Sequence, residues 1–399
     1  MTNYTNKPKP VIASGFSSQH LSKEIADYLA TRVVKMTYKQ FKDKEIQTTI
    51  EENVRGYEVV VVASAAGDSN KQEKEARLLM RAASRAGAKH VTLFLPYMWY
   101  GRSDDIWDER NSPALTDTIE TLRAHCESVV IADPHNAGLT REKFLDTGSP
   151  VKDCTIAHFA FPYAVQLNSM IENGFVRKQG LLFAHADAGG VKRISRNFRA
   201  CLYNILGLQQ RNYNQDDWPQ GLKDRDKATG KIRIKGVSEE VTGKDVAIFE
   251  DMISSGDTAC ESAALLKKLG ARSVSLFATS GLFTIDDKKR EPPSASVDKI
   301  DESELDAVFI TDTYDHRLTD PALHQAIEES TTIHTIRTGP YLGAIIQALH
   351  MDVTSDTSVD KNSVSALMKG THPDQHNNEE QIATPVALKK GNSLTKLTM

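Results

Sequence analysis

The sequence lacks the features that mark several classes of protein. Its four cysteines are far apart and form no CxxC pair, so neither a disulfide framework nor a cysteine-rich metal site is expected. No apolar run approaches membrane-spanning length, and the first residues contain no apolar stretch typical of a secretory signal. The formal net charge of -4 gives no general attraction for nucleic acid. These absences predict a cytoplasmic, soluble protein that binds neither membranes nor nucleic acid.

What the sequence does contain is a regular alternation of short apolar runs and helix-like stretches. The length of 399 residues favours more than one domain. Strands are expected at residues 57–64, 90–97, 128–133, 180–187, 244–251, 272–279 and 307–313. Because these runs are continuously apolar, the strands are expected to be covered on both faces. The sequence therefore predicts an α/β fold, with two domains that each contain a parallel sheet flanked by helices.

The alternation restarts after about residue 155, and this sets the expected domain boundary. The predicted N-terminal domain covers 8–155 and the C-terminal domain 156–351. Within the second domain, residues 209–243 are polar, charged and too long for an inert connection, which indicates a functional flap or a disordered insertion. The tail, 352–399, is rich in polar residues and is expected to be partly disordered.

One stretch, "VAIFEDMISSGDT" at 246–258, carries the most specific chemistry. Its apolar run ends on Glu250 and Asp251, and a small, hydroxyl-rich loop then leads into a helix. The loop residues that can present donors to a phosphate are Ser254, Ser255, Gly256 and Thr258. The two carboxylates can accept hydrogen bonds from the 2- and 3-hydroxyls of a ribose, so the stretch suits ribose 5-phosphate. A solvated turn with a serine helix cap explains the same residues equally well, and no Walker lysine is present.

Further motifs give this stretch a family context. "FEDMISSGDT" resembles the ribose-phosphate loop of the type I phosphoribosyltransferase fold. The other motifs are "FKDKEI" (41–46), "NVRGYEVVVVAS" (53–64), "PYMWYGRSDD" (96–105), "ADPHNAG" (132–138) and "HADAGGVKRI" (185–194). Their order resembles that of ribose-phosphate pyrophosphokinases, also called PRPP synthetases, over roughly residues 10–350. The resemblance implies two phosphoribosyltransferase-like domains. It also implies transfer of the β,γ-diphosphate of ATP to the anomeric hydroxyl of ribose 5-phosphate, giving PRPP for nucleotide biosynthesis, and AMP.

The resemblance also implies roles for residues on the ATP side. A Phe-x-Asp-x-Glu segment from a neighbouring subunit is expected to hold adenine, and it matches Phe41, Asp43 and Glu45. This arrangement needs self-association, at least as a dimer, and the family is typically hexameric. Arg102 takes the place of the arginine that grips the ATP phosphates, followed by Ser103 and Asp104. His135 is expected beside ATP and the metal, which for ATP chemistry is Mg²⁺.

On the acceptor side, Asp187 matches the family acid that binds Mg²⁺ and the sugar hydroxyls. The implied reaction is a direct in-line attack of the ribose 1-hydroxyl on the β-phosphorus, promoted by positioning and by charge neutralisation. The expected catalytic residues are Arg102, His135 and Arg211.

Two departures from the family pattern leave other hypotheses open. Gln209 stands where the flap lysine is expected, and of the basic run only Arg211 keeps its charge. The insertion offers as substitutes Lys223, Arg225, Lys231, Arg233 and Lys235. Asp257 lies inside the phosphate loop, and Glu250 replaces the commoner aspartate. An acid in the loop disfavours a dianionic phosphate unless it points away, whereas the diphosphate of ADP-ribose tolerates it better.

Three hypotheses therefore remain. The first is PRPP synthesis, the second is the same chemistry on ADP-ribose in NAD salvage, and the third is a catalytically inactive regulatory subunit. Retention of the site residues speaks against the third, because an inactive subunit has no need of the full set. Those residues are Arg102, His135, Asp187, Glu250 and Asp251.

Overall fold

The computed structural model groups the chain into two compact units. It describes residues 8–64, 66–104, 110, 112–185, 196–208, 224–225, 232–233, 241–284, 292, 294–318, 320–354 and 382–389. Unit 1 consists of Met1–His158, Thr313–Thr319 and Thr338–Val364, and unit 2 of Phe159–Asp312, Asp320–Arg337 and Ser365–Met399. Both units are discontinuous in sequence, whereas the domain boundaries expected from the sequence are continuous.

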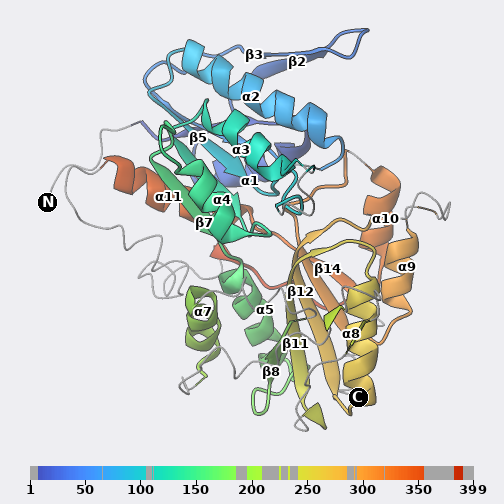
Figure 1. Cartoon of the computed structure of the whole chain (residues 1–399). Coiled ribbons are helices and arrows are strands. Elements are labelled where there is room, and N and C mark those ends of the chain that lie inside the picture. The colour runs from blue at the N-terminus through green and yellow to red at the C-terminus, as the bar shows by residue number, and fades with distance from the viewer. Residues whose placement is uncertain are drawn as a thin grey trace, which may run out of the picture. The chain divides into compact units, whose positions relative to one another are not determined.

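A parallel five-stranded sheet forms the centre of unit 1 (Figure 1). The strands, in their order across the sheet, are β1 (Val11–Ser14), β4 (Glu58–Val62), β5 (His90–Leu95), β6 (Ser128–Ala132) and β7 (Asp153–Ala157). Valine and isoleucine dominate β4 and β6, and every residue of β6 is buried. Such continuous burial is typical of a sheet covered on both faces, as the sequence predicts.

Helices complete unit 1, and two of them pack against each other at a glycine. They are α1 (Gln19–Tyr28), α2 (Ser69–Arg85), α3 (Ala114–Arg123), α4 (Ala137–Phe144) and α11 (Gly339–Thr354), with a 3-10 turn η1 (Phe16–Ser18) before α1. A β-carbon at Gly343 of α11 would lie 2.8 Å from the ring of Tyr28, so this glycine permits the contact with α1.

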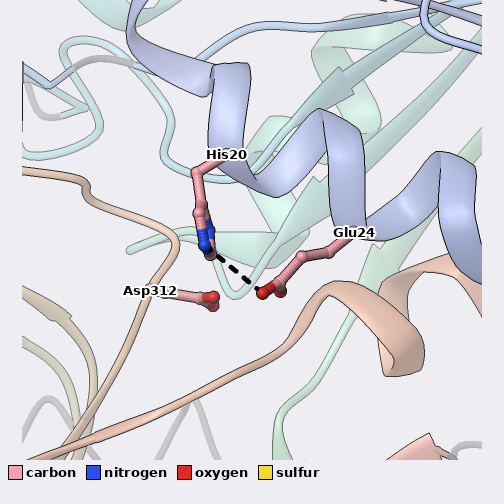
Figure 2. A group of neighbouring side chains, drawn as sticks. All are labelled: His20, Glu24 and Asp312. Carbon is pink, nitrogen blue, oxygen red and sulfur yellow. Dashed lines mark ion pairs between the residues drawn. The ribbon is translucent and has the colours of Figure 1, made fainter.

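On α1, His20 Nε2 lies 3.5 Å from Glu24 Oε1, one helical turn away (Figure 2).

A two-stranded antiparallel hairpin is attached to unit 1 as a separate sheet. It consists of β2 (Met36–Gln40) and β3 (Ile46–Ile50). Lys44 adopts a left-handed conformation in the connecting turn, with φ of 74°. In Figure 1 the hairpin lies at the top of unit 1. Its turn therefore presents the residues between the two strands to solvent, and all five of them are exposed.

Unit 2 contains a second parallel five-stranded sheet. In order, its strands are β14 (Ile333–Ile336), β13 (Ala307–Thr311), β12 (Ser273–Gly281), β11 (Asp245–Ile253) and β8 (Leu182–Ala184). Phe249, Phe277 and Phe309 on three adjacent strands stack with ring centroids 5.4 and 4.8 Å apart. Aromatic pairs at such distances stabilise a sheet beyond simple burial.

Helices and one short antiparallel pair of strands complete unit 2. The helices are α5 (Ala160–Glu172), α7 (Arg196–Leu206), α8 (Asp257–Lys268), α9 (Ala295–Asp301) and α10 (Pro321–Glu329). A short antiparallel pair, β9 (Asp224–Arg225) and β10 (Ile232–Arg233), lies in the insertion. The two parallel sheets with their helices confirm the predicted α/β class. Within the part of the chain that the structure describes, no helix combines the length and apolarity needed to cross a membrane.

A short C-terminal segment, 382–389, returns to unit 2 and packs against it. Ile382 and Ala383 are buried. The buried Gln166 of α5 holds Val386 at both backbone groups: its amide donates to the Val386 carbonyl at 3.0 Å and its oxygen accepts from the Val386 N–H at 2.6 Å. Lys389 Nζ donates to the Ile327 carbonyl at 3.0 Å, near the end of α10. Part of the polar tail is therefore a specific element of unit 2.

Candidate active site

The strongest candidate residues lie where β11 ends and α8 begins. Strand β11 extends through Glu250 and Asp251 to Ile253. Asp251 is buried, with only 7% of its surface exposed, and Glu250 is half-buried. Carboxylate oxygens accept hydrogen bonds, so this strand end is suited to bind a group that donates them. In parallel sheets such strand ends are the usual place for ligands.

Gly256 makes the sharp turn from this strand into α8. It is the residue that precedes the helix and has φ of 80° and ψ of −9°, in the left-handed region that glycine adopts at little cost. A β-carbon there would approach Ile300 of α9 to 3.3 Å, so a larger residue would also be crowded. Because no side chain caps α8, the backbone N–H groups of its first turn and the positive end of its dipole face the loop. This is the arrangement that binds phosphates.

The hydroxyl groups of the loop are held by its neighbours. Ser254 Oγ lies 2.6 Å from Thr284 Oγ1, and Ser255 Oγ donates to Asp257 Oδ2 at 2.6 Å. The other oxygen of Asp257 accepts from Lys299 Nζ at 2.8 Å. Asp257 and Thr258 are exposed at the start of α8. The structure thus places Glu250, Asp251 and the whole predicted phosphate loop on one strand–turn–helix unit.

In unit 1, two loops that follow neighbouring strands bring together the residues expected on the ATP side. A β-carbon at Gly101 would lie 3.8 Å from the β-carbon of His135. The Asn136 amide donates to Asp104 Oδ2 at 2.9 Å, while its own oxygen caps α4 by accepting from the Leu139 N–H. These contacts tie the loop after β5 to the loop after β6. Arg102, Ser103, Asp104 and His135 therefore belong to one neighbourhood.

The positive charge of Arg102 influences the pKa of Tyr97, which lies five residues before it in the chain. Arg102 is exposed, while Ser103, Asp104 and His135 are half-buried. Burial raises the pKa of the Tyr97 hydroxyl, and the positive charge of Arg102 opposes part of that rise. The loop is held in shape by the Ser103 N–H, which donates to the Tyr100 carbonyl at 2.8 Å. An exposed guanidinium on a fixed loop is suited to bind an anion.

The three residues expected to hold adenine lie at the tip of the β2–β3 hairpin. Phe41, Asp43 and Glu45 are all exposed there. The Phe41 N–H donates to the Glu45 carbonyl at 2.8 Å, and the Glu45 N–H donates to Asp43 Oδ1 at 3.2 Å. The Lys39 ammonium lies 4.6 Å from the centre of the Phe41 ring.

Some of the expected site residues lie outside the part of the chain that the structure describes. These are Asp187, Arg211 and Gln209. Their predicted roles, and that of most of the flap, stay predictions. On the described residues, the ATP-side group belongs to unit 1 and the ribose-phosphate group to unit 2.

Two residues that the sequence analysis did not single out are also relevant. Lys299 contacts the phosphate loop although it lies 42 positions from Asp257, and nothing in the sequence marks it. Asp312 directly follows β13 and is 8% exposed, so the sheet of unit 2 carries a second buried acid just beyond a strand end. The signal for Asp312 is the same as for Asp251, an apolar run that ends on an acid.

Comparisons with known proteins agree with this architecture. Residues 10–124 match the N-terminal domain of ribose phosphate pyrophosphokinase. A ribose-phosphate pyrophosphokinase from Aquifex aeolicus is 28% identical over 304 residues, which cover 76% of this chain and 86% of the relative. One from Hyphomonas neptunium is 28% identical over 336 residues, covering 84% and 94%. The crystal structure of phosphoribosylpyrophosphate synthetase from Mycobacterium smegmatis has a similar fold, with a TM-score of 0.66 and 20% identity; the match covers 86% of this chain and 100% of that one.

Proposed function

The chain belongs to the ribose-phosphate pyrophosphokinase family, and on that premise we propose that it transfers the β,γ-diphosphate of ATP to ribose 5-phosphate, giving PRPP and AMP. The observation that carries the proposal is the end of β11. There a buried acid, Asp251, is followed within five residues by a glycine turn that opens α8. A small molecule that carries both a sugar diol and a phosphate matches this arrangement, with the diol at the acid and the phosphate at the glycine turn.

The acceptor is bound by unit 2. Glu250 and Asp251 accept hydrogen bonds from the 2- and 3-hydroxyls of the ribose. The 5-phosphate lies at the amino-terminal end of α8, where backbone N–H groups and the hydroxyl of Thr258 donate to it. Ser254 and Ser255 line the same loop and exchange their present hydrogen-bond partners for the phosphate oxygens.

The ATP donor is bound by unit 1. Arg102 pairs with the phosphates as a bidentate donor, and Ser103, Asp104 and His135 line the same loops. The exposed ring of Phe41 stacks on adenine, and Asp43 and Glu45 accept from the base, in a neighbouring copy of the chain. Because these three residues protrude on a hairpin tip, they are available to a second subunit. Self-association, as a dimer or hexamer, is therefore part of the proposal.

Magnesium is the expected metal. The residues near His135 fit it, because Asp104, which accepts a hydrogen bond from the Asn136 amide at 2.9 Å, offers a carboxylate, and carboxylate oxygens are ligands that Mg²⁺ prefers. His135 would hold the ion together with Asp187 and the phosphates of ATP. When bound, Mg²⁺ supplies neutralisation of the phosphate charge.

The reaction needs no covalent intermediate with the protein. The anomeric oxygen attacks the β-phosphorus, the bond from that phosphorus to the oxygen that bridges it to the α-phosphorus breaks, and AMP leaves. The proton of the attacking hydroxyl passes to solvent. The contribution of the chain is to hold the two substrates in line and to neutralise charge, with Arg102 and Arg211 as donors to the phosphates. With Gln209 in place of the flap lysine, Arg211 carries more of that task.

Of the two other hypotheses, transfer to ADP-ribose is weakened by one contact. Asp257 would repel a dianionic phosphate, but both of its oxygens are engaged by Lys299 and Ser255. The main reason to prefer a diphosphate as the bound group is thereby reduced. An inactive regulatory subunit is disfavoured because the chain retains the full set of expected site residues, which an inactive subunit does not need.

The test uses the purified protein with ATP and Mg²⁺, and either ribose 5-phosphate or ADP-ribose. We expect AMP release with ribose 5-phosphate, and a phosphorus NMR spectrum that shows a new diphosphate on the anomeric carbon. AMP release with ADP-ribose alone would establish the second hypothesis. Failure to release AMP with either acceptor would indicate a regulatory subunit. The Asp251→Asn variant serves as the control for contaminating activity.

A further inference from the structure

We propose that Lys299 determines which acceptors the phosphate loop takes: by pairing with Asp257, it allows a loop that contains an acid to bind a phosphate monoester. This inference rests on the function proposed above and concerns the same site. It assigns a role to a residue of α9 that lies outside the strand–turn–helix unit.

The contacts of Lys299 with the loop are direct. Its Nζ lies 2.8 Å from Asp257 Oδ1 and donates to the Ser255 carbonyl at 3.2 Å. The second oxygen of Asp257 accepts from Ser255 Oγ at 2.6 Å. The carboxylate is thus held between α9 and the loop, and its charge is compensated by an ammonium that also touches the loop backbone.

Packing fixes the position of α9 against the loop. A β-carbon at Gly256 would come within 3.3 Å of Ile300, the residue after Lys299, and Ile300 is fully buried. Ser296 Oγ donates to the Thr284 carbonyl at 3.3 Å, and Thr284 Oγ1 is hydrogen-bonded to Ser254. The backbone of α9 is therefore anchored beside the loop, so a long side chain at 299 reaches Asp257 without a change of structure.

Charge determines the consequence for binding. The loop already follows Glu250 and Asp251, and an uncompensated Asp257 at the start of α8 would oppose the dipole effect that attracts phosphate. A phosphate monoester carries up to two negative charges, so it would feel this repulsion more strongly than a diphosphate with one charge per phosphorus. Lys299 and Asp257 are 34% and 55% exposed, so solvent screens the pair and the expected effect is moderate, about tenfold in acceptor affinity.

The decisive variant is Lys299→Met, which keeps most of the length of the side chain and removes its charge. We expect the KM for ribose 5-phosphate to rise about tenfold, while kcat and the KM for ATP stay within about twofold. Lys299→Arg should retain wild-type values. Lys268→Met, at the other end of α8, is the matched control and should change none of these quantities.

A second variant separates charge pairing from direct phosphate binding. In the double variant Asp257→Asn/Lys299→Met the acid is neutral, so affinity for ribose 5-phosphate should return to within about twofold of the wild type. An unchanged KM in Lys299→Met would overturn the inference. A double variant that stays as weak as Lys299→Met would also overturn it, because Lys299 would then act on the phosphate by itself.

Calorimetric binding of ribose 5-phosphate distinguishes failure of this inference from failure of the proposed function. If the wild type binds the sugar phosphate but releases no AMP, the proposed reaction is wrong, and the variants still decide the role of Lys299. If the wild type turns over and Lys299→Met binds normally, only the role of Lys299 is wrong. A wild type that neither binds nor turns over ribose 5-phosphate would remove both.

Discussion

A glycine with positive φ lies before a helix at corresponding places in the two units, in different surroundings. Each unit has a parallel sheet of five strands in sequential order, apart from the hairpin in unit 1 and the β9–β10 pair in unit 2. In unit 1 the second strand of the sheet, β4, leads through Gly67 and Asp68 into α2; in unit 2 the second strand, β11, leads through Gly256 into α8, whose first residue is Asp257. Both glycines have positive φ, 93° and 80°.

The two aspartates have different partners. Asp68 caps its own helix by accepting from the Lys71 N–H at 3.1 Å, whereas Asp257 pairs with Lys299 and leaves α8 without a side-chain cap. The strands differ as well: β4 ends on valines, while β11 carries Glu250 and Asp251 near its end. A glycine with positive φ before a helix is thus common to both units, and the residues placed around it make only one of the two turns a candidate binding site.

The most severe way to test this difference is to remove the buried acid of unit 2. In Asp251→Asn, a charge-assisted hydrogen bond to the sugar becomes neutral, at about 3 kcal/mol. We expect kcat/KM for ribose 5-phosphate to fall about a hundredfold. The matched change in unit 1, Asp68→Ala, removes a helix cap and should cost about 1 kcal/mol of stability with activity unchanged. Equal loss of activity in both variants would mean that the two turns do not differ in function.

The helices that follow the two turns also differ in what they bury. Helix α2 buries Glu75, which is 3% exposed and accepts from the Phe16 N–H at 2.9 Å, whereas none of the buried residues of α8 is acidic. Burial raises the pKa of Glu75 from 4.5 to about 7, although the Phe16 hydrogen bond opposes the rise. The folded protein therefore binds more protons than the unfolded chain between these two pH values.

This difference gives unit 1 a predicted dependence on pH. The contribution of Glu75 to stability is largest below pH 4.5, decreases as the pH rises, and is lost above about pH 7. The total change is about 3 kcal/mol, at about 1.4 kcal/mol for each pKa unit. Denaturant unfolding of the wild type and Glu75→Gln between pH 5 and 8 measures it. The difference in free energy of unfolding between the two proteins should change across this pH range, and a constant difference would contradict the raised pKa of Glu75.

A third test asks whether the loops of unit 1 bind the other substrate. Arg102→Lys keeps the charge but loses the two-pronged geometry of the guanidinium. The KM for ATP should rise about tenfold while the KM for ribose 5-phosphate stays unchanged, which is the mirror image of the effect expected for Lys299→Met. Arg85→Lys, exposed in the last turn of α2, is the control. A rise in the KM for ribose 5-phosphate instead would assign the loop to the acceptor.

The smallest predicted effect is on stability. Each unit includes a segment from near the C-terminal end of the sequence, α11 in unit 1 and 382–389 in unit 2, and the test concerns the second of these. Gln166→Ala removes both hydrogen bonds to Val386 and should lower stability by about 1 kcal/mol. Thermal unfolding measures this loss, and limited proteolysis should release the tail sooner. Asn168→Ala on the same helix is the control, because its bond to Glu172 is exposed. If both variants unfold alike, the segment does not depend on Gln166.

The fold could be predicted where the sequence carries continuous apolar runs. All seven strands expected from such runs are present, although β8 covers only Leu182–Ala184 of the expected 180–187. Within the two parallel sheets, the strands that escaped prediction are β1, β7 and β14, which are four or five residues long and mix polar with apolar side chains. A run this short carries too little pattern to distinguish a strand from a loop.

In the candidate site, too, contiguous residues could be predicted and residues from distant segments could not. Glu250, Asp251 and the loop after them are contiguous, so their chemistry can be recognised in sequence order. Lys299 could not be recognised, because it reaches Asp257 only after β12 and α9 have folded. The proximity of Gly101 to His135 likewise depends on β5 and β6 being neighbours in the sheet. Contacts between distant segments follow from the topology and not from local pattern.

The close contact between Tyr28 and Gly343 has a consequence for how the chain is made. The ribosome completes α1 early and α11 more than three hundred residues later, yet both belong to unit 1. While the chain grows, the surface of α1 that will receive α11 stays open to water or to chaperones. The first unit therefore becomes complete only after α11 has been made, when most of unit 2 has already left the ribosome.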